Sequence, residues 1–422
     1  MKLIWLFYFI EILILTLLRP LATNFEAIGV IAVLTHGIFT LLVLYSNKKK
    51  IRKFFLLGYL IRLVGLFWDL YARNIFYLPH SGADSESFYR QAILLSTNLK
   101  RISLERELYV QINGVLMSLI GPQRIFLQYM NVLLGITVIF FIYKIMKALT
   151  INNKTCKNIM LLAALFPTSV VLSSIFLREI FPTFFVVLSL YFFVKWYNSP
   201  RYSNILYSFL YLGIASMFHS GVSGIAIGYL FAYLFYKHQA NNFRFTLKTI
   251  TVFIIITVLL FPILTIFNEQ IFRKFGNLNE SEDLYRIATG SKAGGAVYLK
   301  GLTINSFLDF ILYSPIKSIY FLISPLPWDW RNLSDIMTFL LDSLLYLYTA
   351  IASFKLWKNL KKRKPLIILF LIMIISTSII FGVGVGNAGT ALRHRQKISP
   401  LFLILISLLL EERNDFNQME LV

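Results

Sequence analysis

The chain has 422 residues, of which 57% are hydrophobic and only 14% are charged, and its mean hydropathy is +0.69. Soluble domains contain about 25% charged residues, so this composition excludes an ordinary soluble protein. Apolar runs of about 20 residues recur along the chain, and each is long enough to cross a bilayer as a helix. We therefore expect an all-α, polytopic integral membrane protein with a single transmembrane domain over residues 1–422.

The net charge of +21 indicates membrane topology and not nucleic-acid binding. Five short polar stretches contain 20 Lys or Arg and no Asp or Glu, namely residues 46–53, 144–158, 195–204, 237–248 and 355–364. Such loops face the cytoplasm under the positive-inside rule and attract anionic lipid headgroups. The only cysteine, Cys156, excludes a disulfide framework.

Placing the basic stretches inside predicts about twelve spans with both termini in the cytoplasm. The predicted spans are residues 3–18, 28–45, 54–77, 125–147, 158–176, 180–195, 204–218, 222–236, 249–267, 335–355, 365–385 and a short last one, 400–410.

Two long segments, 78–124 and 268–334, fall on the external side. Within the first, residues 85–97 and 109–120 are amphipathic but too short to span, so we expect helices lying in the outer interface. Residues 306–324 are interrupted by Pro315 and Lys317 and are expected to be re-entrant or interfacial. The common soluble motifs for phosphate loops, zinc hydrolases and serine hydrolases are missing, and the five histidines show no metal-ligand spacing.

The stretch "LPHSGADSESFYRQA" places two carboxylates directly after an apolar run. Asp84 can cap a helix that starts at Ser85, with Glu86 in the favourable first turn. A carboxylate at the membrane face can also act as a general base or hold a divalent cation. Capping and catalysis are compatible, so Asp84 is the candidate catalytic residue and Glu86 is the second choice.

The turn "LREIFP" places Arg178 and Glu179 between two apolar runs. The alternative to a functional role is a pair of snorkelling side chains at the interface. Charges this close to hydrocarbon are costly and usually face a cavity or a partner. We therefore take Glu179 as a second candidate catalytic residue and Arg178 as a candidate substrate-binding residue.

Several external cations are candidates for binding an anionic substrate. Arg393, His394 and Arg395 lie together with Lys397 before the short last span, where a lipid phosphate or pyrophosphate suits them and a headgroup clamp is the plainer alternative. Arg286 and Lys292 are further candidates, in a glycine-rich loop that either forms an anion nest or is simply flexible. Arg331 is the last candidate, and its neighbours Trp328 and Trp330 either stack on a sugar or belong to an aromatic belt.

This layout resembles the GT-C superfamily of membrane glycosyltransferases, which includes the protein O-mannosyltransferases. Asp84 looks like the acidic residue of that family's first external loop, and residues 85–97 and 109–120 look like its juxtamembrane helices. Glu179 looks like the second external acid. The resemblance covers residues 54–240 best, and two extra helices in residues 1–53 depart from the pattern.

The resemblance implies a polyprenyl-phosphate or -pyrophosphate-linked sugar donor and inversion at the anomeric carbon. Asp84 would be the base, Glu179 would orient the acceptor or bind a divalent cation such as Mg²⁺ or Mn²⁺, and the late arginines would face the donor phosphate. The expected product is a surface polysaccharide or glycolipid, made on the extracytoplasmic face of the cell membrane from a glycan or lipid-linked acceptor. A polymerase of oligosaccharide repeat units and a lipid-linked sugar flippase or transporter are the alternatives.

Overall fold

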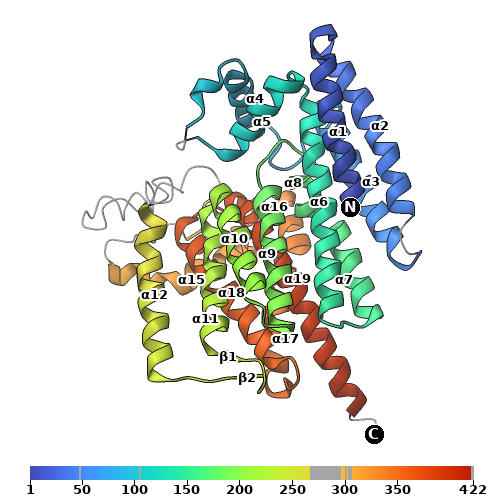
Figure 1. The fold of residues 1–422 in the computed structure, drawn as a ribbon. Helices are drawn as coiled ribbons and strands as arrows, with labels where there is room; N and C mark the ends of the chain where they lie inside the picture. The colour runs from blue at the N-terminus through green and yellow to red at the C-terminus, as the bar shows by residue number, and fades with distance from the viewer. Residues whose placement is uncertain (47–48, 104–105, 267–295, 300–301, 303–306, 420–422) are drawn as a thin grey trace. The chain divides into compact units, whose positions relative to one another are not determined.

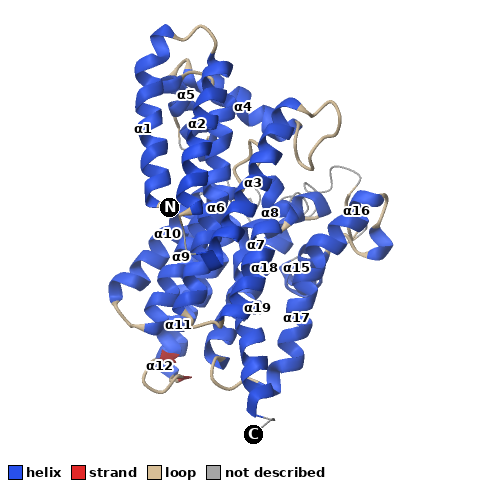
Figure 2. Cartoon of the chain, turned by 90° about the vertical axis from the view of Figure 1, so that its right-hand side faces the viewer, coloured by secondary structure: helices blue, strands red, loops and turns tan. Residues whose placement is uncertain are grey.

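The computed structural model of residues 1–422 describes all residues except 47–48, 104–105, 267–295, 300–301, 303–306 and 420–422. The described chain is almost entirely helical (Figures 1 and 2). Its helices are α1 (Lys2–Leu18), α2 (Phe25–Tyr45), α3 (Lys49–Tyr71), α4 (Ala83–Ser96), α5 (Leu108–Ile120), α6 (Arg124–Ala148), α7 (Asn153–Leu165), α8 (Pro167–Leu172), α9 (Ile180–Asn198), α10 (Tyr202–Phe218), α11 (Ile225–Phe235), α12 (Leu247–Ile266), α15 (Phe307–Ile323), α16 (Leu333–Thr338), α17 (Leu344–Leu356), α18 (Lys364–Gly384) and α19 (Ala388–Met419).

Two short strands form the sheet found among the described residues. β1 (Tyr236–Lys237) pairs antiparallel with β2 (Asn242–Phe243), in the register Tyr236 to Phe243 and Lys237 to Asn242. Figure 2 shows this hairpin as a small red element in an otherwise helical chain. It joins α11 to α12 within the stretch that the basic pattern assigns to a cytoplasmic loop.

Seven helical stretches in the described residues are long and apolar enough to cross a membrane. They are Lys2–Leu21, Phe25–Tyr45, Lys49–Tyr71, Arg124–Ala148, Ile180–Asn198, Leu333–Asn359 and Lys364–Gly384. This finding agrees with the predicted all-α membrane protein. The predicted count of about twelve spans is not reproduced, because several other apolar helices are shorter.

Two predicted spans differ clearly from the observed helices. Residues 158–176 do not form one helix, because α7 ends at Leu165 and α8 begins at Pro167, which has no N–H to continue the ladder. The prediction of a short last helix over 400–410 is also wrong, because α19 begins at Ala388 and continues to Met419. The cations predicted to lie in an external loop are therefore helical, and Arg395 among them forms a buried ion pair described below.

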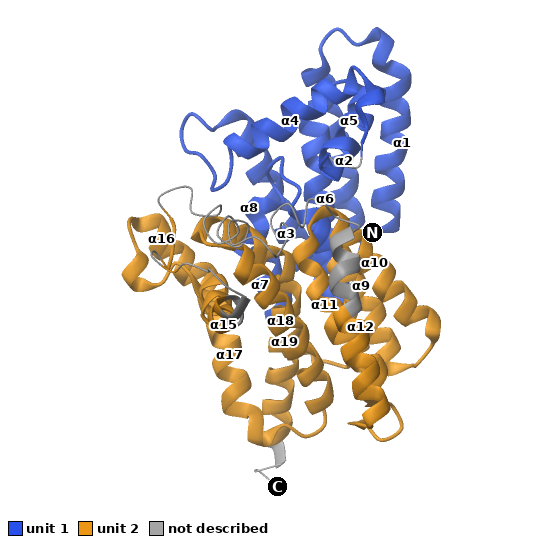
Figure 3. Ribbon diagram, turned by 90° about the vertical axis from the view of Figure 1, so that its left-hand side faces the viewer, with its two compact units in different colours: residues 1–143, 157–184 blue, residues 144–156, 185–422 orange. Residues whose placement is uncertain are grey.

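The chain divides into two compact units (Figure 3). Unit 1 comprises residues 1–143 and 157–184, and unit 2 comprises residues 144–156 and 185–422. In unit 1, α1, α2 and α3 pack in sequence, α4 packs on α5, and α3 contacts α8. A Cβ at Gly135 of α6 would lie 2.8 Å from the Nε of Arg62 in α3, so this glycine leaves the room that the buried guanidinium occupies.

Unit 2 is organised around α18, which packs against α11, α15 and α19. The far end of α19 is fixed by two carboxylates. Glu411 accepts hydrogen bonds from the backbone N–H of Asn152 at 3.2 Å and from its side-chain amide at 2.6 Å. Glu412 accepts from the backbone N–H groups of Lys361 and Arg363, just before α18 begins. The two acids therefore satisfy amides that precede α7 and α18.

Candidate functional site

The amphipathic pair α4 and α5 carries the first candidate catalytic residues. The prediction that Asp84 caps this helix is wrong, because the N-cap is Gly82, with φ of +121°, a conformation that favours glycine. The Ser85 hydroxyl accepts from the Gly82 N–H at 3.2 Å and donates to the Gly82 carbonyl at 3.1 Å. Asp84 lies in the first turn with an exposed side chain, where the helix dipole favours a carboxylate.

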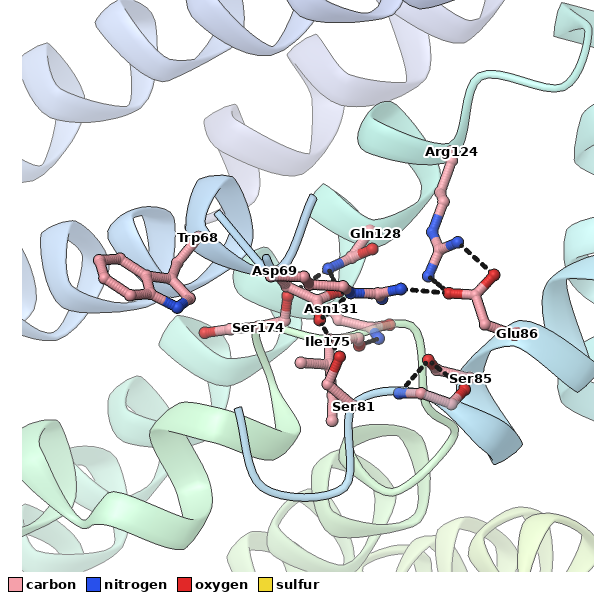
Figure 4. Close-up of polar contacts among 12 residues, drawn as sticks. Trp68, Asp69, Ser81, Ser85, Glu86, Arg124, Gln128, Asn131, Ser174 and Ile175 are labelled. Carbon is pink, nitrogen blue, oxygen red and sulfur yellow. Dashed lines mark hydrogen bonds and ion pairs between the residues drawn. The ribbon is translucent and has the colours of Figure 1, made fainter. Parts of the chain in front are cut away.

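Glu86, in the same first turn of α4, is held by two arginines. Its carboxylate forms ion pairs with Arg73 and with Arg124, the latter at 2.8 Å (Figure 4). Arg73 also pairs with Asp69 of α3 at 3.0 Å, and the Ser81 hydroxyl donates to the same carboxylate. Arg73 therefore bridges two carboxylates and ties the start of α4 to the end of α3.

The arginines set the protonation state of Glu86. The hydrogen bond from Arg124, followed by that from Arg73, outweighs partial burial and lowers the pKa of Glu86 to about 2. A carboxylate with so low a pKa is a weak proton acceptor at neutral pH. The geometry thus favours a positioning role for Glu86, while its predicted catalytic role stays a prediction.

Two amides of α6 fix the irregular turn that follows α8. Gln128 donates to the Asp69 carboxylate at 2.8 Å and to the Ser174 carbonyl at 2.6 Å (Figure 4). Asn131 donates to the Ile175 carbonyl at 2.8 Å and to the Leu177 carbonyl at 3.0 Å. These bonds satisfy backbone carbonyls that lie outside the helices. The turn that they fix leads directly to Glu179, the second candidate acid.

Glu179 is fully buried, one residue before α9 begins, and its carbonyl accepts from the Thr183 hydroxyl at 2.8 Å. Its neighbour Arg178 forms an ion pair with Glu107 and lies over the ring of Phe88, 5.9 Å from the centroid. The Arg178 side chain therefore points into unit 1. This agrees with the expectation that charges in this turn face partners, although Glu107 was not predicted.

Arg62 is a further buried charge of unit 1, with no exposed surface. Every N–H of its guanidinium has an acceptor, at distances of 2.9 to 3.5 Å. The acceptors are the hydroxyls of Ser169 and Ser173 and the carbonyls of Gly58, Ala163 and Ala164. Two of these carbonyls belong to the last turn of α7, so Arg62 supports the break in the helix before Pro167.

The cations predicted near residue 393 lie in the first turns of α19, in unit 2. Arg395 is fully buried and forms an ion pair with Asp342 at 2.9 Å. Its Nη1 also donates to the carbonyls of Leu322 and Ser324, each at 2.7 Å. The Asp342 carboxylate projects from a π-helical turn, Phe339–Ser343, which joins α16 to α17.

The other cations of this group differ in exposure. His394 is 8% exposed, and its Nδ1 accepts from the buried Lys397 ammonium at 2.9 Å. Its ring lies 4.3 Å from that of His219. Arg393 is partly exposed. The predicted phosphate-binding role of these residues stays a prediction, and Arg393 is the one whose exposure suits it best.

A cavity of about 420 Å³ is lined by residues of the segment 325–331, which precedes α16, and by Ala388, where α19 begins. Its wall includes Arg331 together with Tyr298, Tyr320, Trp328, Asp329 and Trp330. Arg331 forms a two-point ion pair with Asp335, at 2.7 and 2.8 Å. The other two predicted cations, Arg286 and Lys292, lie outside the described residues.

The predicted site residues are thus divided between the two units. Asp84, Glu86, Arg178 and Glu179 belong to unit 1, whereas Arg331, Arg393, His394 and Arg395 belong to unit 2. Within the described ranges, no three His, Cys, Asp or Glu side chains are grouped to hold a metal ion. Arg73 stands between Asp69 and Glu86, so these two acids do not form an open cation site.

Sequence reasoning missed Arg124, Gln128 and Asn131, which all lie on one side of α6. Their polar character in the first turns of an apolar helix was the available signal. Sequence reasoning also did not select Glu11 as a site residue. Glu11 is 6% exposed in α1, and its Oε2 has no hydrogen-bond partner within the described chain. No family model, curated protein or solved structure matches this sequence.

Proposed function

We propose that the protein is a membrane glycosyltransferase that moves a sugar from a polyprenyl-phosphate or -pyrophosphate donor to a glycan or lipid-linked acceptor. The observation that carries this proposal is the exposed Asp84 carboxylate in the first turn of α4. Its helix is fixed by the ion pairs of Glu86 with Arg73 and Arg124. A rigid support of this kind is what a general base requires.

In the proposed reaction, Asp84 takes the proton of the acceptor hydroxyl while the acceptor oxygen forms a bond to the anomeric carbon. The bond from that carbon to the donor phosphate breaks, and the phosphate oxygen leaves with the electron pair. The developing negative charge needs a cation, and it is the resemblance that assigns this role to the late arginines, of which Arg393 is partly exposed on α19. The roles of Glu179 and of a divalent cation, which the resemblance implies, remain part of the proposal.

The proposed site faces the extracytoplasmic side of the cell membrane. In this proposal the chain crosses the membrane about twelve times, and both of its termini are inside. This orientation rests on the five stretches that contain 20 basic residues and no acidic ones. A product on that face is a surface polysaccharide or glycolipid.

The test replaces Asp84 with Asn in a strain that depends on this protein. Because general-base catalysis contributes about 10²- to 10⁴-fold, we expect the surface glycan to be lost while its lipid-linked precursor accumulates. Glu26→Gln is the matched control, since Glu26 is also an exposed acid in the first turn of a helix, α2. Normal glycan with normal protein level in Asp84→Asn would exclude this residue as the base.

The same experiment separates transfer of one sugar from polymerisation of repeat units. Mass spectrometry of the accumulated lipid identifies an incomplete repeat in the first case. A complete, single repeat on the lipid carrier identifies a polymerase, which uses the same type of donor.

The buried carboxylate of Glu11 favours a second candidate, a flippase or transporter for a lipid-linked sugar. Glu11 lies in α1, which is long and apolar enough to cross a membrane, and faces the protein interior. Ionisable groups inside a membrane often mark transport or proton paths. Glu11→Gln would abolish translocation of a fluorescent lipid-linked sugar in proteoliposomes if this candidate is correct, and would leave glycan assembly intact if it is not.

A further inference from the structure

The cavity beside the start of α19 has a wall of aromatic rings held in fixed positions. The Trp328 Nε1–H donates to the Tyr320 hydroxyl at 3.0 Å, and the Trp330 Nε1–H donates to the Pro325 carbonyl at 3.2 Å. The Tyr298 hydroxyl donates to the Val385 carbonyl at 3.0 Å, and the Tyr298 and Tyr320 rings lie 5.4 Å apart. These bonds fix the rings in place. Tyr298 is only 3% exposed and Trp330 packs against Phe339, so the open ring face is that of Trp328.

Trp328 is unusual because it is fixed and yet 71% exposed. A tryptophan that serves only packing buries most of its surface. An indole held by its own N–H at the edge of a cavity offers a flat, electron-rich face. Such a face suits the weakly positive C–H groups of a sugar ring, which stack on aromatic rings for the same electrostatic reason that aromatic edges do.

Two charged side chains complete the wall, Asp329 and Arg331. Arg331 is paired with Asp335, so its charge is balanced within the protein. The cavity therefore combines an aromatic surface with one carboxylate and one compensated guanidinium. This balance does not favour an anion such as phosphate, and the charged groups do not favour an acyl chain. Hydroxyl groups, which donate and accept hydrogen bonds, match both side chains.

We infer that this cavity is a saccharide-binding site, in which a sugar ring stacks on Trp328 and directs hydroxyls to Asp329 and Arg331. Its volume of about 420 Å³ lies within the usual range for small-ligand sites, about 300–1,000 Å³. The choice of saccharide rests on the proposed glycosyl transfer. The site would hold a sugar unit of the donor or of the acceptor.

The position of the cavity agrees with this role. Ala388 lines it at the first residue of α19, and Arg393 follows five residues later on the same helix. Five residues of an α-helix advance about 7.5 Å along its axis. A sugar in the cavity would thus lie at the same end of α19 as Arg393, and the two residues project about 140° apart around the helix axis.

The test measures binding without turnover, on the full chain in a zwitterionic detergent or amphipol that carries no sugar headgroup. Saturation-transfer NMR is recorded with the methyl glycosides of glucose, galactose, rhamnose and N-acetylglucosamine. We expect transfer to the ring C–H protons of at least one of them. Trp328→Ala should weaken that binding about tenfold or more, because it removes the stacking face.

Trp357→Ala is the matched control. Trp357 is 43% exposed in the same unit but does not line the cavity, so its loss should leave the affinity unchanged. Trp328→Phe keeps a ring but loses the bond to Tyr320, and an intermediate affinity is expected. Thermal unfolding of each variant shows whether the fold is intact. If Trp328→Ala does not fold, the glycoside affinity of Trp328→Phe is compared with that of the unchanged protein instead.

Three outcomes would overturn the inference. They are the absence of saturation transfer for all four glycosides, binding that is equally strong in Trp328→Ala, and displacement of the glycoside by inorganic phosphate at millimolar concentration. Failure here leaves the Asp84→Asn test standing, since that test measures transfer. Failure of the Asp84 test equally leaves a measured affinity at this cavity unchanged.

Discussion

Arg62 in unit 1 and Arg395 in unit 2 are both fully buried, but the two charges are satisfied in different ways. Arg62 forms no ion pair with a carboxylate among the described residues and donates only to carbonyls and hydroxyls. Arg395 forms an ion pair with Asp342 and shares its Nη1 with two carbonyls. The first charge is thus held by backbone and hydroxyl dipoles, and the second by an opposite charge.

The comparison shows that free backbone carbonyls at the end of a broken helix can stabilise a buried cation. The carbonyls of Ala163 and Ala164 belong to the last turn of α7, and the proline that follows cannot supply the next N–H. The partial negative charge at the end of a helix favours a cation. Arg62 thus replaces backbone donors, whereas Arg395 and Asp342 join α19 to the segment between α16 and α17.

The largest expected effect is that of Arg62→Met. It leaves several buried acceptors without donors, and because each such group costs about 1–3 kcal/mol, we expect a loss of about 3–5 kcal/mol in the free energy of unfolding. The loss is measured by unfolding in mixed micelles with increasing SDS. Arg62→Lys is the control for charge, and its three donors should preserve part of the stability. A loss below about 1 kcal/mol would contradict the assignment.

Arg395→Met should cost slightly less, about 3 kcal/mol, because the main loss is the unpaired Asp342 carboxylate. The comparison is sharpened by the double variant Arg395→Met with Asp342→Leu. It removes both charges and should recover at least half of the loss. No single second substitution is expected to rescue Arg62→Met, since its acceptors are distributed over several backbone groups. A double variant as unstable as Arg395→Met would show that the broken ion pair is not the main cause of the lost stability.

Glu86 is an intermediate case, since its ion pairs are partly exposed. Its pKa in the folded protein is about 2, below the ordinary value of 4.5, so the folded state binds its proton less readily than the unfolded state. The stabilisation is therefore complete above pH 4.5 and is lost as the pH falls toward 2. At neutral pH it is worth about 1 kcal/mol after allowance for solvent screening.

Glu86→Gln should remove this contribution and flatten the decline in stability between pH 4.5 and 2. The measurement is the unfolding midpoint as a function of pH, with Glu26→Gln as the control acid. An equally steep decline in Glu86→Gln would assign the acid sensitivity to other carboxylates.

A small effect is expected near Pro400, which lies inside α19 and is compared here with Pro167. It frees the carbonyl of Gln396, and the Ser399 hydroxyl donates to that carbonyl at 3.0 Å. Here one hydroxyl satisfies the carbonyl that a proline frees, as Arg62 does at the break before Pro167. Ser399→Ala should cost about 0.5–1.5 kcal/mol, as for a single hydrogen bond, measured by the same unfolding assay. A cost equal to that of Arg62→Met would remove the distinction between the two prolines.

Much of the helical framework could be predicted from the sequence. α2, α6, α9 and α18 agree with the predicted spans within a few residues, because each is one uninterrupted apolar run. The start of α19 was missed because its cluster of cations looked too polar for a buried helix. The partner of Arg395 lies 53 positions earlier in the chain, and no local pattern connects the two.

The same limit applies to the candidate site. Asp69 and Arg73 are four residues apart on one helix, and this pair is visible in the sequence. The pairing of Glu86 with Arg124 joins residues 38 positions apart, and that of Arg178 with Glu107 joins residues 71 positions apart. Ion pairs at such separations depend on how the helices pack. The sequence therefore indicated which charges were costly to bury, but not which partner satisfied each of them.

The two acids at the far end of α19 affect how the protein is made. Glu411 and Glu412 satisfy backbone amides that precede α7 and α18, and both helices are synthesised before the end of α19. Until the end of α19 packs in place, those amides must be hydrated or held by chaperones. Assembly of unit 2 therefore finishes late in translation, and a ribosome that stalls before residue 411 would release a chain whose earlier helices are open to degradation.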